Sequence, residues 1–120
     1  MDNEHDYDII AKRLSKHIEV VDQMMSHLNL RVLNVSCRTG NSDGGCFTAY
    51  VEICSIDGNE IPSDVCIKMN TYDSDGNLVD TSNTSIRAKN FIGYDTVSIY
   101  FSQDCALDEA ASGRLYATRW

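Results

Sequence analysis

The chain has 120 residues, of which 42% are hydrophobic, and its 10 basic and 18 acidic side chains give a net charge of −8. This length predicts one domain, residues 1–120, with enough chain to bury its own core. A negative surface repels phosphate backbones and no apolar run approaches the roughly 20 residues that cross a bilayer, so we expect neither a nucleic-acid nor a membrane partner.

Residues 5–28 carry the pattern of one uninterrupted helix. Apolar side chains recur at alternating spacings of four and three, which is a heptad seam, and no proline or glycine breaks the run. Such a helix either covers apolar surface of its own domain or pairs with a protein partner, most simply a second copy in a homodimer. The seam offers more apolar surface than a small sheet needs, so we predict an interaction through Tyr7, Leu14, Ile18, Val21, Met25 and Leu28.

Residues 29–120 predict an antiparallel β-sandwich of six or seven strands. The run 30–37 is predicted as the first strand, and side chains alternate between the two faces in the runs 47–54, 65–72 and 97–101, as in strands with one buried face. A turn at Asp73–Gly76 leads into a further run at 77–81, the Ser- and Thr-rich segment 81–86 is typical of an exposed edge, and 113–120 is the last strand. The predicted fold is therefore mainly β, with one N-terminal α-helix.

The segment 65–101 resembles the small bacterial immunoglobulin-like domains named for an F-x-L-Y-D motif, and more loosely fibronectin type III modules. The resemblance rests on the strand end Asn70-Thr71-Tyr72-Asp73, the turn 75–79 and Gly93 before the strand Val97–Phe101. In those domains a proline usually precedes this glycine, whereas Ile92 does so here. The resemblance implies an immunoglobulin- or fibronectin-III-like sandwich that binds or scaffolds other molecules without catalytic residues.

The cysteines indicate free thiols. Cys37, Cys46, Cys54, Cys66 and Cys105 contain no C-x-x-C pair, the spacing usual in zinc sites. The acidic, polar N-terminus is the reverse of a secretory signal, so we expect a cytoplasmic protein. In an exported protein, a disulfide between Cys37 and Cys46 across the Gly-rich loop 38–45 would be the alternative.

No motif predicts catalysis, a cofactor or a metal. The three histidines, at positions 5, 17 and 27, all lie in or beside the predicted helix, away from any nucleophile motif. Asp73-x-Asp75-x-Asn77 begins like a calcium loop, but Leu78 and Thr84 stand where that loop needs glycine and glutamate. We therefore expect no catalytic residue, no bound cofactor and a simple hairpin turn.

The sequence thus favours a non-enzymatic protein–protein interaction or scaffold module that dimerises through the helix 5–28. One alternative is a ligand-binding sandwich for a carbohydrate or peptide, using exposed tyrosines and the loop 38–45. Another, suggested by small size and acidity, is an immunity or antitoxin-type inhibitor. Several aromatic residues suit outer sheet faces, and we expect the N-terminal helix to cover them: Tyr50, Tyr72, Tyr100, Tyr116 and Trp120.

Overall fold

The computed structural model describes residues 3–39, 46–58, 60–102 and 106–120. In chain order its elements are α1 (Asn3–Ser15), β1 (Ile18–Val20), α2 (Asp22–His27), β2 (Leu30–Arg38), β3 (Phe47–Ser55), β4 (Val65–Tyr72), β5 (Leu78–Ile86), the 3₁₀ turn η1 (Ala88–Asn90), β6 (Tyr94–Phe101), α3 (Ala106–Glu109) and β7 (Ser112–Arg119).

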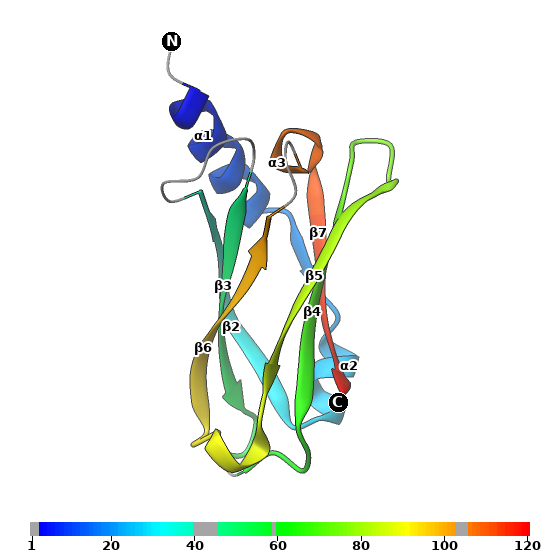
Figure 1. Ribbon diagram of the computed structural model, residues 1–120. Coiled ribbons are helices and arrows are strands. Elements are labelled where there is room, and N and C mark those ends of the chain that lie inside the picture. The colour runs from blue at the N-terminus through cyan, green and yellow to red at the C-terminus, as the bar shows by residue number, and fades with distance from the viewer. Residues whose placement is uncertain (1–2, 40–45, 59, 103–105) are drawn as a thin grey trace.

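Two sheets face each other across the core (Figure 1). One sheet has the strand order β1-β7-β4-β5 and the other the order β2-β3-β6, so the described residues contain the seven strands of a sandwich. The prediction of a mainly β sandwich is confirmed. It is not wholly antiparallel, because the short β1 runs parallel to β7.

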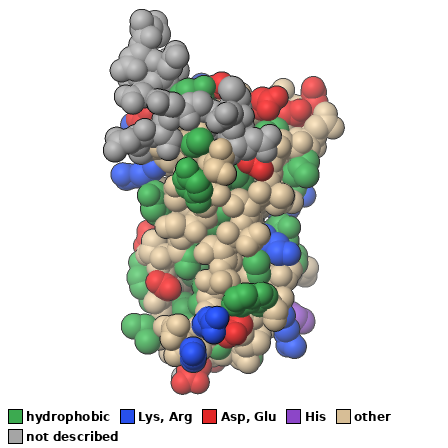
Figure 2. Space-filling view, in the orientation of Figure 1, with side chains coloured by type: hydrophobic (Ala, Val, Ile, Leu, Met, Phe, Trp, Pro, Cys, Tyr) green, Lys and Arg blue, Asp and Glu red, His purple; other side chains and the backbone are tan. Residues whose placement is uncertain are grey.

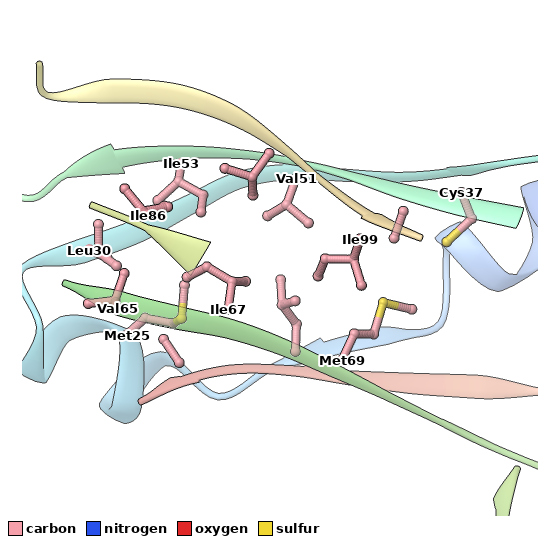
Figure 3. Packing of buried hydrophobic residues seen from close by; sticks show 14 of the residues in the cluster. Met25, Leu30, Cys37, Val51, Ile53, Val65, Ile67, Met69, Ile86 and Ile99 are labelled. Carbon is pink, nitrogen blue, oxygen red and sulfur yellow. The ribbon is translucent and has the colours of Figure 1, made fainter. Parts of the chain in front are cut away.

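The core lies between the sheets and follows the alternation of the strands. In β4 every second residue, from Val65 to Thr71, is buried, while the residues between them are half-buried on the outer face. Phe47 and Phe101 stack with their ring centroids 4.5 Å apart at one end of the core. Figure 3 shows side chains of both sheets directed at one another, from β3 and β6 on one side and β4 on the other: Val51, Ile53, Ile99, Val65, Ile67 and Met69.

The hairpin β4–β5 closes on the predicted Asp-Gly turn. The Asp73 carboxylate accepts the backbone N–H groups of Asp75 and Asn77, both at 2.9 Å, and Gly76 has a φ of 86°. That conformation favours glycine, and the carboxylate is occupied by the turn itself. The segments predicted separately at 77–81 and 81–86 form one continuous strand, β5, because both pair with β4.

The prediction of one helix over 5–28 is wrong. α1 ends at Ser15, and its last turn tightens as the N–H groups of Lys16 and His17 bond to carbonyls three residues back. The chain then extends as β1, whose β-branched Ile18 and Val20 suit a strand. The edge of β7 holds this segment: the Gly113 N–H donates to the His17 carbonyl at 3.0 Å.

The N-terminal segment fills one side of the sandwich and leaves the outer sheet faces uncovered. α1 packs against β2, and α2 packs against both β2 and β7. The helices therefore lie on the side of the sandwich where β2 is the edge of one sheet and β1, beside β7, is the edge of the other (Figure 1). On the opposite side β5 and β6 approach each other, and the Ser82 hydroxyl donates to the Tyr100 carbonyl at 2.7 Å.

Candidate functional site

The predicted interaction residues of the heptad seam do not form one surface. Once β1 interrupts the helix, Leu14, Met25 and Leu28 each enter the core of their own chain and are at most 4% exposed. Tyr7 and Ile18 pack against the same core while partly exposed, and Val21 is half-buried. The seam thus joins the N-terminal segment to the sandwich.

The expectation that this segment covers the predicted aromatic residues is also wrong. Tyr50 and Tyr100 lie on the outer face of the three-stranded sheet, 39% and 56% exposed. Tyr72 and Tyr116 are half-buried on the outer face of the other sheet, and Trp120 is exposed beyond β7. They stay uncovered because the helices follow the strand edges.

Sequence reasoning missed Tyr94, which is 48% exposed at the start of β6. The predicted strand begins at Val97, although the alternation extends back from Tyr100 through Ser98 and Thr96 to Tyr94. We call the outward-facing residues of β2, β3 and β6 the tyrosine face. Strand pairing gives its members as Arg31, Asn34, Ser36, Arg38, Thr48, Tyr50, Glu52, Cys54, Tyr94, Thr96, Ser98 and Tyr100.

Glu52 organises the middle of the tyrosine face. It accepts the Tyr94 hydroxyl at 2.8 Å and the Asn34 side-chain amide at 3.2 Å, so it links all three strands. A shallow depression of about 350 Å³ lies beside it, and Tyr50 and Arg38 are among its lining residues. The site therefore combines an aromatic ring with a carboxylate, an amide and a guanidinium.

The side chains of Tyr50 and Tyr100 are both exposed and lie close together on the tyrosine face. Tyr100 pairs with Thr48, two residues from Tyr50, so the two tyrosines are diagonal neighbours on adjacent strands. Neither hydroxyl makes a hydrogen bond to another residue in the described part of the chain. Exposed rings with free hydroxyls combine apolar area with a polar tip, as binding surfaces require.

On the outer face of the four-stranded sheet, by contrast, polar and charged side chains bond to one another. The Arg114 guanidinium bonds to Glu19 at 2.6 Å and lies 5.2 Å from the centre of the Tyr72 ring. The hydrogen bond and the charge of Glu19 raise the pKa of Arg114 above its ordinary value. Asn70 donates to the Tyr72 hydroxyl at 3.2 Å and accepts from Thr81 at 2.7 Å, which extends the network to the edge strand.

The described thiols and histidines are not gathered into one site. Cys37, Cys46, Cys54 and Cys66 are free. The alternative of a Cys37–Cys46 disulfide is therefore not what the structure contains. Within the described ranges, no group of three or more His, Cys, Asp or Glu side chains is arranged to hold a metal ion. None of the described helices has the length and apolar character needed to cross a membrane.

Two further predicted features have a definite position, and a third lies mostly outside the described residues. His17 and His27 are exposed and belong to different segments, after α1 and at the end of α2. The calcium-like run from Asp73 is the hairpin turn described above. The loop 38–45, predicted to contribute to a ligand site, lies outside the described residues from 40 onward.

Comparison with known proteins identifies no family for this chain. The sequence matches no protein-family model and no curated protein. The structure is similar to the crystal structure of Campylobacter jejuni cj0090, with a TM-score of 0.48 and 17% sequence identity over 87% of this chain and 98% of that chain. Similarity at this level implies nothing about what this protein binds.

Proposed function

We propose that this protein is a non-enzymatic interaction module that binds another protein through the tyrosine face. The observation that carries the proposal is the exposure of Tyr50, Tyr94 and Tyr100 together on one uncovered sheet face. Tyrosine supplies a large, rigid contact area with few side-chain rotations to immobilise, which is why it dominates the centres of protein interfaces.

The charges of the tyrosine face support a protein partner. The chain has 18 acidic residues, yet Glu52 is the one carboxylate among the outward positions of these strands, and it is half-buried. The basic residues there are the arginines Arg31 and Arg38, with no lysine among the outward positions. Enrichment in Tyr and Arg with depletion of Lys, Glu and Asp is the composition of an interface core.

A carbohydrate is the second candidate, favoured by the depression beside Glu52. A sugar ring stacks on an aromatic side chain while carboxylate and amide groups bond to its hydroxyls, and Tyr50, Glu52 and Asn34 stand together at the depression. This candidate predicts that a small ligand shifts the NMR signals of Glu52 and Asn34 first. A protein partner would cover Tyr100 in addition to Glu52 and Asn34.

We propose as well that the module works in the cytoplasm and is related to immunoglobulin-like domains. Four free cysteines in the described ranges support a reducing compartment. The β4–β5 hairpin and Gly93, which has a φ of 102° ahead of β6, support the kinship.

Site-specific cross-linking in the cells that make the protein tests the proposed function, because it captures a partner whose identity is unknown. A benzophenone amino acid replaces Tyr50 or Tyr100. Lys68, half-buried on the outer face of the other sheet, is the matched control position. We expect the same discrete protein adduct from both tyrosine positions and none from the control.

An adduct formed equally from Lys68 would contradict the tyrosine face as the binding surface. If no discrete protein adduct forms, the proposal of a protein partner fails. A panel of oligosaccharides titrated against the isotope-labelled protein then tests the second candidate. Saturable shifts at Glu52 and Asn34 would support it, and unchanged spectra would exclude it for the sugars used.

A further inference from the structure

Part of the outer edge of strand β5 has no backbone partner, and one contact shows which of its backbone groups point outward. β5 pairs with β4 alone among the described strands. The Thr81 N–H donates to the Asp80 carboxylate at 2.8 Å, so it points away from β4. Because these directions alternate along a strand, the backbone groups of Asn83 and Ser85 point the same way.

Several other backbone groups at the free edges are bonded to side chains. On β6 the Thr96 N–H donates to the Asp95 carboxylate at 2.8 Å, and the Tyr100 carbonyl accepts the Ser82 hydroxyl. On β5 the Asp80 carboxylate occupies the Thr81 N–H in the same manner. In the described part of the chain, the outward backbone groups of Asn83 and Ser85 have no such partner, so this half of β5 is a template for a further strand.

The open part of β5 is also uncharged. Residues 81–86 read Thr-Ser-Asn-Thr-Ser-Ile, within a chain of net charge −8. Figure 2, drawn in the orientation of Figure 1, shows mostly uncharged polar side chains and backbone in the middle of the molecule, where Figure 1 draws β5 and β6. Two copies of an acidic chain approach each other most easily along such a stretch, because like charges repel elsewhere.

We propose that β5 pairs antiparallel with the β5 strand of a second copy of this chain, about a twofold axis at Asn83. In this register the two Asn83 residues exchange N–H···O=C bonds, and Ser85 donates to the carbonyl of the partner's Thr81. The N–H groups of Asn83 and Ser85 have no partner in the described part of the chain, so the pairing does not require the Asp80 carboxylate to release the Thr81 N–H. The two four-stranded sheets become one continuous sheet.

A second copy suits this edge better than an unrelated peptide. The twofold register sets Asn83 opposite its equivalent and Thr81 opposite the partner's Ser85, and such polar pairs hydrogen-bond across antiparallel strands. The side chains that flank the edge on the outer face, Asn70 and Thr81, bond to each other and offer no apolar pocket that would read a peptide sequence. Symmetry supplies the specificity instead.

The dimer is expected to be weak, because pairing along a single strand edge buries less than the ~1,200 Å² of standard stable interfaces. The pairing uses a different surface from the tyrosine face. It does not depend on the proposed function, and either can fail alone.

Sedimentation of the full chain over concentrations up to about 1 mM tests the pairing, since this range detects a weak dimer. Asn83→Pro removes an outward N–H without touching the β4 ladder, and proline is tolerated at such edge positions. We expect it to raise the dimer dissociation constant by about tenfold or more, a loss of at least 1.4 kcal/mol. Ser98→Pro, at an outward position on β6, is the matched control and should leave the dimer unchanged.

Two further variants keep the test decisive if Asn83→Pro fails to fold. Asn83→Asp sets two carboxylates face to face at the twofold axis and should abolish the dimer. Asp80→Ala frees the Thr81 N–H for the partner and should strengthen the dimer more than Asp75→Ala, which removes the same charge from the exposed turn. A monomer at every concentration overturns the proposal. A dimer that survives both Asn83 variants, or one that Ser98→Pro disrupts equally, also overturns it.

Discussion

The Cys37 N–H, on the outer edge of β2, donates to the Ser15 hydroxyl at the end of α1 at 2.8 Å. The same hydroxyl donates to the Ala11 carbonyl at 3.0 Å, so one side chain joins the last turn of α1 to the edge of the sandwich. An unpaired N–H on an edge strand invites association, and here the chain's own N-terminal segment covers it. This segment therefore belongs to the domain.

The first prediction follows from that relationship. Leu14→Asp together with Ile18→Asp should unfold the protein, because Leu14 is 1% exposed and a carboxylate there would be buried without a partner. Ile9→Asp is the control on the same helix, since Ile9 is 44% exposed, and it should change the unfolding free energy little. Urea denaturation compares them. A well-folded double variant would show that the segment is dispensable.

The second prediction concerns the contact of β1 with β7. A Cβ added at Gly113 would lie 2.7 Å from the Ile18 side chain and 3.3 Å from the backbone oxygen of Asn70. The Ile18 atom is the terminal Cδ1 of a flexible side chain, whereas the Asn70 oxygen belongs to the backbone, so Gly113→Ala should destabilise the protein by about 1 kcal/mol, the low end of the usual cost of overpacking. Ser112→Ala, on the adjacent half-buried residue, is the control for thermal unfolding. Equal stability of both variants would mean that β1 is loosely held.

The third prediction separates the hairpin turn from a calcium site. Asp73→Ala should cost about 1–3 kcal/mol, because the carboxylate accepts two backbone N–H groups of the turn. Asp75→Ala, in the same turn and more exposed, should cost much less. Millimolar calcium should leave the melting temperature of the wild-type protein unchanged. A calcium-dependent rise that both substitutions remove would restore the metal interpretation.

The fourth prediction is a pH dependence. Burial raises the pKa of Cys37 from its ordinary 9.0 to about 11, against the opposing effect of its hydrogen bond with Ser15. As the pH rises, the thiol loses its proton first in the unfolded protein. Its contribution to the free energy of unfolding is therefore complete below pH 9 and is lost towards pH 11. The loss amounts to about 3 kcal/mol relative to neutral pH.

Cys37→Ala tests this, because it removes the titrating group. Between neutral pH and about pH 11, the unfolding free energy of this variant should fall less steeply than that of the wild type. Cys54→Ala, at a half-buried position, should follow the wild type. Parallel curves for all three proteins would contradict the assignment to Cys37.

The sequence predicted those parts of the fold that local alternation determines. β3 and β4 have one buried and one outward face, so their period of two was sufficient, and Gly76 with Asp73 marked the turn between β4 and β5. The break in the N-terminal helix was not predictable in this way. Ile18 and Val21 satisfy a heptad seam, but Gly113 and Leu115 at the far end of the chain pair with this segment and hold it extended.

The tyrosine face was predictable in part. Strand parity puts Tyr50 and Tyr100 opposite the buried positions of their strands, so their outward direction could be read from the sequence. Whether the outer sheet faces stay uncovered depends on where the N-terminal segment packs, and no local pattern contains that information. Tyr94 would have been found by extending the alternation of β6 backward from Val97.

The most direct test of the central claim is the affinity of the cross-linked partner for the double variant Tyr50→Ala, Tyr100→Ala, measured by calorimetry. Tyr72→Ala, on the outer face of the opposite sheet, serves as the control. If the tyrosine face is the binding surface, the double variant should lose at least about tenfold in affinity while remaining folded, and the control should bind like the wild type. Equal affinity of the double variant and the wild type would contradict the account.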